Sequence, residues 1–344
     1  MKLRNQGFGI LAAAVVLCLP ASAAGKKRSN VPVESTGGGS ALIEGSAVMW
    51  SDPGNVASRN LYYGPGGKEH SPAGRFTFEK EDLDGSNPKF VVRDDQNVKW
   101  KVKLGAEARP ETVAARLVWA VGYPANEDYF VPELHVREMP AHLKRGQNLV
   151  LPGGVVRDVR LKRYLKGEEK VGTWKWRDDP FVDTREYNGL RVMMALVNNW
   201  DLKDVNNSIY REKGGRNVYM VSDLGASFGT DHPTWPHAKA KGNLNSYQHS
   251  SFIDGADEQF VSFRDPGRPS FKYWILPVQC VSRWRLHWIG RDIPRADARW
   301  IGGLLARLTP KQIEDAFRAA GYSPEEVAGF SKIVEQRIAE LKAL

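Results

Sequence analysis

The stretches Asn198–Asn207 (NNWDLKDVNN) and Ser222–Gly229 (SDLGASFG) decide the fold that the sequence predicts. The first follows the run Leu190–Asn198 (LRVMMALVN), which is apolar on nearly all sides and therefore predicts a buried helix. The second follows a short apolar pattern, NVYMVS, which predicts a buried strand. Each stretch thus places a carboxylate, Asp201 or Asp223, directly after a buried element, where a short loop can hold it rigidly in a cleft.

The residue types in these two stretches suit phosphoryl transfer. That reaction needs a carboxylate to orient or deprotonate the acceptor, oxygen ligands for Mg²⁺, and cations near the phosphates. Asp201 offers the carboxylate, Lys203 can reach the transferring phosphate, and Asn206 and Asp223 can supply hard oxygen ligands. The alternative is that Asp201 and Asn206 merely cap a helix, which is a common use of both residues.

The segment 46–140 predicts a mostly β region with one helix. The helix is expected over Glu111–Val121, with Pro110 at its first position and Gly122 at its end. Alternation in KWKVKL places Lys101 and Lys103 on the same strand face, so both are candidates for a lysine that points into a site. The predicted strands cover residues 76–79, 89–93, 98–104 and 129–136.

The D-x-K-x-x-N spacing from Asp201, followed by Asp223-Leu224-Gly225, resembles the catalytic loop and the metal-binding Asp-Phe-Gly of the protein-kinase-like superfamily. The segment Asp84–Lys89 (DGSNPK) looks like the phosphate loop Gly-x-x-Pro-Lys of HipA-like kinases and their lipid-kinase relatives. This likeness runs from about residue 76 to 230 and places the motifs in the superfamily's order.

The resemblance implies a two-lobed α+β fold, with a β-rich lobe over 46–140 and a mainly helical lobe over 141–344. ATP with Mg²⁺ or Mn²⁺ would bind between the lobes, and the γ-phosphate would pass to an acceptor that the sequence does not identify. The strand 129–136 would lead to the hinge between the lobes. The implied roles are catalytic for Asp201 and Lys203, metal-binding for Asn206 and Asp223, and nucleotide-binding for Gly85, Ser86, Lys89, Lys103 and Glu111.

Departures from the superfamily pattern keep other functions open. Leu224 stands where the metal motif has Phe, Trp200 precedes Asp201 where relatives often have Arg or His, and the phosphate loop has one Gly. Glu107 also competes with Glu111 as the partner of the lysine. A catalytically silent nucleotide-binding module, or an enzyme that transfers a nucleotidyl or glutamyl group with the same site, therefore remains an alternative.

Residues 1–24 are typical of a signal peptide, with a charged start, a short apolar run and small residues before the expected cleavage point. Residues 25–45 are rich in Gly and Ser and predict a flexible tether. We therefore expect an exported protein, periplasmic or extracellular, without a transmembrane span after cleavage; an uncleaved anchor is the alternative. ATP is expected to be scarce in such a compartment, which favours the silent module.

Composition excludes several classes of protein. The hydrophobic fraction of 42% and the 11 Trp exclude global disorder. The net charge of +9 is spread through mixed-sign segments, so we expect no nucleic-acid partner, although an anionic surface could attract the chain. The two cysteines, Cys18 and Cys280, leave no intramolecular disulfide after cleavage, and Cys280 is expected to be a small buried hydrophobe.

The C-terminal part predicts one long loop and then helices. Residues 226–270 are polar and almost without periodicity, so we expect a functional loop that shapes the acceptor site. His232 and His237 within it could bind a metal, although a plain loop role suits two histidines without a third ligand better. Two capping boxes, one from Thr309 and one from Ser323, each followed by Pro, predict helix starts.

Overall fold

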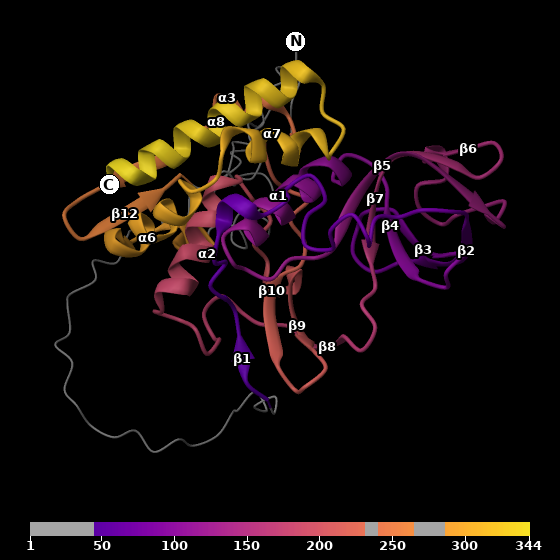
Figure 1. Cartoon of the computed structure of the whole chain (residues 1–344), viewed down its shortest axis with the longest axis horizontal. Helices are drawn as coiled ribbons and strands as arrows, with labels where there is room; N and C mark the ends of the chain where they lie inside the picture. Colours follow the sequence, from indigo (N-terminus) through magenta and orange to yellow (C-terminus); the bar gives the residue numbers. More distant parts are fainter. Residues whose placement is uncertain (1–44, 231–239, 265–285) are drawn as a thin grey trace, which may run out of the picture. The chain divides into compact units, whose positions relative to one another are not determined.

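The computed structural model describes residues 45–230, 240–264 and 286–344, which belong to one compact unit of mixed α and β structure (Figure 1). The predicted signal peptide and most of the tether lie outside these residues, as do Cys18, Cys280, His232 and His237. Within the described part of the chain, no helix has both the length and the apolar character that crossing a bilayer requires.

A six-stranded sheet forms from the predicted strands and two further ones, in the order β4-β3-β2-β5-β7-β6 (Figure 1). Because β4 also pairs with β7, the sheet closes on itself around a core that includes Phe90, Trp100, Val102 and Leu161. The bounds are β2 Phe76–Asp82, β3 Lys89–Asp94, β4 Lys99–Lys103, β5 Asp128–Arg137, β6 Val150–Leu151 and β7 Val155–Arg163.

The sheet extends beyond the predicted boundary at residue 140. Strand β7, which pairs with both β4 and β5, was not predicted because its sequence (VVRDVRLKR) carries charged residues at positions that an ordinary core strand fills with apolar ones. The chain consequently leaves the sheet after Arg163, and β5 does not lead to the expected hinge but turns back into β6 and β7.

Helix α1 (Ala108–Ala120) is the predicted helix of this region, and it packs on β5 and β7 and against α7. It starts two residues before Pro110, with Glu107 as its N-cap residue, so Pro110 does not take the first position. The helix is buried on almost every side because the sheet and α7 cover different faces of it. Glu111 of its first turn is therefore buried, whereas Arg109 stays partly exposed.

A second sheet, β1-β10-β9-β8, and helix α2 (Arg185–Leu196) lead into the stretches Asn198–Asn207 and Ser222–Gly229. The predicted buried helix is α2, whose N-cap Thr184 accepts a hydrogen bond from the Tyr187 N–H. The predicted buried strand is β10, which pairs antiparallel with β9. The bounds are β1 Ala47–Val48, β8 Glu169–Gly172, β9 Asn207–Arg211 and β10 Asn217–Val221.

The C-terminal helices α6 (Arg295–Leu305), α7 (Pro310–Arg318) and α8 (Pro324–Ala343) cover this second region. Both predicted capping boxes are confirmed, at Thr309 and Ser323. The core beneath them includes packed aromatic rings, with Phe317 stacked on Phe330 at 5.0 Å between centroids.

The expectation of a structureless loop over 226–270 is wrong for residues 240–264. This part contains α3 (Leu244–Gln248), β11 (Ile253–Ala256) and β12 (Phe260–Phe263), elements too short to show a clear period in the sequence. The remaining elements are β13 Ile293–Pro294 and the 3₁₀ helices η1 Val56–Ser58, η2 Gln147–Leu149, η3 Asp204–Asn206 and η4 His287–Gly290.

Candidate active site

Lys103, the last residue of β4, is the centre of a buried cluster of charges. Only 5% of its surface is exposed. Its Nζ lies 2.7 Å from Oε2 of Glu111, 3.0 Å from Oε2 of Glu107 and 3.1 Å from Oδ1 of Asp223. The sequence separates Lys103 from Asp223 by 120 residues, so the fold brings together the two halves of the predicted site.

The three carboxylates arrive from different elements for simple geometric reasons. Glu107 and Glu111 are four residues apart at the start of α1, so they lie one above the other on one face of the helix. Asp223 follows directly after β10. The short connection from β4 to α1 turns through Gly105, whose φ of +83° suits glycine best.

A second cation, Arg160 of β7, extends the cluster inward. Its Nη2 lies 2.8 Å from Oε1 of Glu111, and its Nη1 lies 3.1 Å from Oδ1 of Asp128. Glu111, Asp128 and Arg160 are all almost completely buried. Glu111 therefore bridges two cations, and its position is fixed from both sides.

The electrostatics of the cluster favour the charged forms of Lys103, Asp223 and Glu107. Burial alone would lower the pKa of the Lys103 ammonium, but Glu111 and Asp223 outweigh it and hold the pKa above its usual value. Burial would raise the pKa of the Asp223 carboxyl, yet the charge and hydrogen bond of Lys103 and the Gly225 N–H hold it below its usual range. Glu107 behaves in the same way, with Lys103 and Lys241 lowering its pKa against burial.

The structure separates the two candidate lysines of β4. Lys101 pairs with Asp82 of β2 at 2.7 Å and is partly exposed, whereas Lys103 pairs with the α1 carboxylates and Asp223. The structure does not decide between the two candidate glutamate partners of the lysine, because Glu107 and Glu111 both contact Lys103.

The predicted phosphate loop is the turn between β2 and β3. Gly85 adopts a φ of +63°, and Ser86 is exposed. The Lys89 ammonium donates to the Asp84 carbonyl and lies 3.9 Å from Oδ1 of Asp82. Burial lowers the pKa of Lys89.

One side chain connects this turn to the buried cluster. Nδ2 of Asn87 donates to Oε2 of Glu107 at 2.5 Å. The connection ties a loop of exposed backbone to the acid that already contacts Lys103, so the loop and the cluster belong to one site.

The stretch with Asp201 lies beside the stretch with Asp223. The Trp200 N–H donates to the Ala226 carbonyl at 3.1 Å, and the Ser222 N–H donates to the Asn206 carbonyl at 2.9 Å. The two bonds lie on either side of Asp201 in one segment and on either side of Asp223 in the other. The two loops that carry these carboxylates are therefore joined to each other through their backbones.

Within this pair of loops Asp201 is only partly covered. Its Oδ1 lies 2.7 Å from Nζ of Lys203, with 29% of the Asp201 side chain and 56% of the Lys203 side chain exposed. The Asn206 amide nitrogen donates to the Asp201 carbonyl at 2.6 Å. The amide oxygen of Asn206 is therefore the atom of that side chain left for another ligand.

The donor set of the site suits a hard divalent cation. Carboxylate oxygens of Glu107, Glu111 and Asp223 lie within 4.8 Å of one another. The Lys103 ammonium contacts all three of these acids, and carboxylate oxygens are ligands that Mg²⁺ and Mn²⁺ prefer.

Gly225 shows how closely the loops approach α1. A Cβ built on Gly225 would lie 2.7 Å from Cβ and from Oε2 of Glu107, which real side chains do not tolerate. A glycine is therefore required if Glu107 is to stand next to Asp223.

Sequence reasoning missed several members of the site. Asn87, Asp128, Arg160 and Lys241 all contact the cluster, and none was singled out. A signal existed for Arg160, which occupies an inward position of a strand whose neighbours Val159 and Leu161 are apolar, but β7 itself was not predicted. Lys241 and Asn87 lie in irregular segments, where no periodicity indicates direction.

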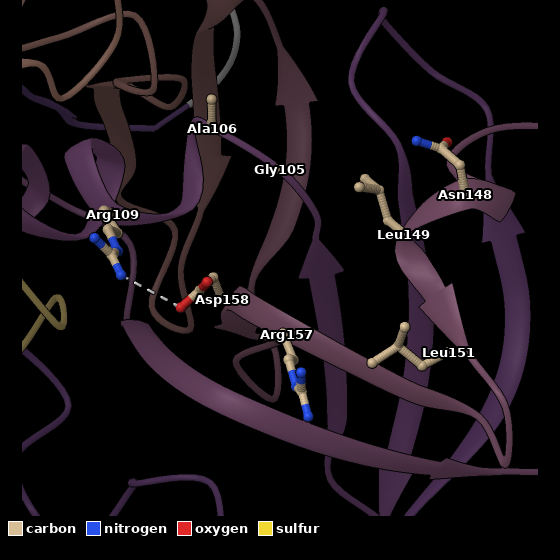
Figure 2. A pocket seen from close by; sticks show the side chains of 8 residues that line it. All are labelled: Gly105, Ala106, Arg109, Asn148, Leu149, Leu151, Arg157 and Asp158. Atoms are coloured by element: carbon tan, nitrogen blue, oxygen red, sulfur yellow. Dashed lines mark hydrogen bonds and ion pairs between the residues drawn. The ribbon is translucent and has the colours of Figure 1, made fainter.

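A separate cavity of about 470 Å³ lies beside the start of α1 (Figure 2). The β4–α1 connection, η2, β6 and β7 line it, and it contains none of the predicted site residues. Arg109 and Asp158 approach to 3.5 Å in it, and Leu149 and Leu151 form its apolar side. None of the residues that line this cavity belongs to the cluster around Lys103, so the two are treated as separate sites.

Two kinases of known structure are similar to the chain at low sequence identity. No protein-family model and no curated protein matches the chain. Among solved structures, a proinflammatory kinase CtkA of Helicobacter pylori is similar at 12% identity and a TM-score of 0.43, covering 79% of this chain and 97% of that one. The Golgi casein kinase is similar at 10% identity and a TM-score of 0.33, covering 79% of this chain and 72% of that one. Scores below 0.5 do not establish a common fold, so the contacts within this chain carry the interpretation of the site.

Proposed function

We propose that the chain is a kinase-like phosphotransferase that binds ATP with Mg²⁺ or Mn²⁺ between two lobes and transfers the γ-phosphate to an acceptor hydroxyl. One observation carries this proposal: Lys103 joins Glu111 of α1 to Asp223, while Asp201 stands on the loop hydrogen-bonded beside Asp223. The lobes would be the closed sheet on one side and the helical region with the second sheet on the other.

In this reaction the chain positions the reactants more than it reacts with them. Lys103 would contact the phosphates, with Glu111 holding its ammonium in place, and the turn with Gly85, Ser86 and Lys89 would cover them. Asp223 and Asn206 would hold the divalent cation, with Glu107 as a neighbouring oxygen donor. A bound cation would neutralise charge on the phosphate oxygens.

Asp201 would direct the acceptor. The acceptor oxygen forms a bond to the γ-phosphorus as the bond from that phosphorus to the bridging oxygen breaks, so that ADP leaves. The hydroxyl proton passes to the Asp201 carboxylate, and Lys203 stabilises charge on the transferring group. Such a base contributes about 10²–10⁴-fold to the rate.

A transfer assay with γ-labelled ATP tests this proposal. The protein without residues 1–24 should transfer label to itself, to water or to a hydroxyl acceptor, and Asp201→Asn should reduce the rate by about 10²–10⁴-fold. Glu258→Gln, an equal loss of charge at an exposed position, should not change the rate. Equal rates for Asp201→Asn and the unmodified protein would contradict the assignment.

A silent nucleotide-binding module is the second candidate, and one observation favours it. Lys103 is already held by three carboxylates, and Asp201 is neutralised by Lys203. Saturable ATP binding with no transfer to any acceptor would support this module, and a transferred mass other than phosphate would support nucleotidyl or glutamyl transfer. Export to the periplasm or beyond, and attraction to anionic surfaces, are part of the proposal and rest on the sequence alone.

A further inference from the structure

A second cavity, of about 890 Å³, lies beside the loop that carries Asp201 and Lys203. Lys203 and Asp204 form one side of it, Lys175 to Arg177 form another, and η4 with Arg291 forms the third. Its volume is in the range of ligand pockets. Because the Lys203 ammonium lies 2.7 Å from the Asp201 carboxylate, the cavity opens one side chain away from the proposed base.

The lining of this cavity is positively charged. Lys175, Arg177, Lys203 and Arg291 outnumber the two acids, Asp204 and Asp292. Lys203 and Arg291 are paired with acids outside the lining, Asp201 and Asp254. Among the residues that the structure describes, no carboxylate pairs with Lys175 or Arg177, and both side chains are exposed.

An apolar platform lies next to these cations. The guanidinium of Arg177 stands 4.3 Å from the ring centroid of Trp288, a cation–π contact. Arg191 of α2 holds the platform, because its guanidinium donates to the carbonyls of Trp288 and Ile289 at 3.1 and 2.8 Å. Leu286 adds further apolar surface. The cavity therefore combines a fixed aromatic surface with two cations, Lys175 and Arg177, that pair with no carboxylate in the part of the chain that the structure describes.

From this arrangement we infer that the acceptor carries a negatively charged group beside its hydroxyl, and that Lys175 and Arg177 bind that group while the acceptor lies along Trp288. This inference rests on the proposed function and names the acceptor class of the same site: a hydroxyl compound or serine-containing peptide with an adjacent phosphate or carboxylate. A neutral acceptor would leave the two cations solvated and gain nothing from them.

Peptide binding measured by fluorescence polarisation tests the inference without requiring turnover. A labelled peptide with one Ser among Glu residues should bind at least about tenfold more tightly than the same peptide with Gln in place of Glu, a difference of about 1.4 kcal/mol. The double variant Lys175→Glu/Arg177→Glu should lose this preference. Lys170→Glu/Lys332→Glu, the same charge change at exposed positions outside the cavity, should keep it.

The source of the anionic group is distinguished by competition. Displacement of the Glu peptide by glycerol 3-phosphate, but not by glycerol, indicates a small anionic acceptor, and displacement by unlabelled Glu peptide alone indicates an acidic peptide; either result supports the inference. Equal affinity for the Glu and Gln peptides, or a preference that survives in Lys175→Glu/Arg177→Glu, overturns it.

Transfer of label from γ-labelled ATP, measured in parallel, separates this inference from the proposed function. Selective peptide binding without any transfer would support the anion site and contradict the proposed phosphotransferase activity. Transfer that is equally fast to the Glu and Gln peptides, and equally fast to glycerol and glycerol 3-phosphate, would support the phosphotransferase and contradict the anionic acceptor.

Discussion

Two charged regions of the site differ in how the fold holds them. Lys103 is buried and contacts three carboxylates from two separate parts of the chain, and Arg160 fixes one of these from behind. Asp201 is partly exposed and has a single ion-pair partner, Lys203, which is itself half exposed. The first region is held by many contacts, while the second is held mainly through its backbone.

This difference indicates different tasks. A buried charge must stay paired, because an unpaired one costs several kcal/mol, so the Lys103 cluster serves both the fold and the proposed binding of phosphates. The Asp201–Lys203 pair costs little to open, since exposed pairs contribute about 0–1 kcal/mol. A base and a cation that must contact an incoming acceptor need an exposed position where their ion pair opens easily.

The largest expected effect is the loss of stability in Lys103→Met. Removal of the ammonium leaves Asp223 without its cation and Glu107 and Glu111 with one partner fewer, so unfolding by urea should require about 3–5 kcal/mol less. The matched variant Lys101→Met opens a partly exposed pair with Asp82 and should cost about 1 kcal/mol or less. Equal losses in the two variants would show that burial of Lys103 has no special role.

Gly225→Ala should cost about 1–3 kcal/mol, because the new methyl group meets Glu107 at 2.7 Å and must push it away from Lys103. Gly303→Ala is the matched control: it lies in α6, no atom is within 4 Å of its Cβ, and a gain of about 0.4–1 kcal/mol is expected. Thermal unfolding of both variants checks the pair. A Gly225→Ala protein as stable as the original would contradict the close approach of α1 and the Asp223 loop.

Acid should weaken the buried region through Asp223. Its pKa lies below the ordinary 3.8 in the folded protein, so its contribution to stability is present above pH 3.8 and disappears as the pH falls through the lower folded value. The pKa of Lys103 is raised, so its contribution is complete below pH 10.5 and disappears only above it.

The stability difference between the unmodified protein and Asp223→Asn measures this dependence. It should be constant between about pH 5 and 9 and shrink below pH 3.8, as protonation makes Asp223 resemble Asn. Urea unfolding at a series of pH values gives the difference directly. A difference that stays the same at low pH would mean that Asp223 is not stabilised by Lys103.

The smallest expected effect on stability comes from Asp201→Asn, which should change the free energy of unfolding by about 0.5 kcal/mol or less. The same variant has the largest expected effect on transfer. Together with Lys103→Met it tests whether the two regions divide the tasks of stability and reaction. A strongly destabilised Asp201→Asn protein would show that this carboxylate is structural.

The sequence predicted the helices and strands whose patterns lie within a few neighbouring residues. It did not predict those whose residues are stabilised only by contacts with distant parts of the chain. The buried helix α2, the strand β10 and the capping boxes of α7 and α8 follow from apolar runs and caps a few residues long. Strand β7 escaped prediction because Arg160 fills a core position that only the distant Glu111 and Asp128 make favourable.

The candidate site shows the same division. The spacing of Asp201, Asn206 and Asp223 predicted that they belong to one site, and backbone hydrogen bonds join the two stretches that carry them. The choice between Lys101 and Lys103 needed the positions of their distant partners, because Lys101 pairs with Asp82 and Lys103 with Glu111 of α1. The contacts of Asn87 and Lys241 with Glu107 depend on loop conformations that no periodicity encodes.

Calorimetric titration with ATP, with and without Mg²⁺, tests the central claim most directly. The protein should bind ATP more tightly with Mg²⁺ than without it, and Asp223→Asn should lose this gain while keeping its fold, with Glu258→Gln as the unaffected control. An Asp223→Asn protein that retains the full gain from Mg²⁺, or an unmodified protein that binds no ATP in either condition, would contradict the account.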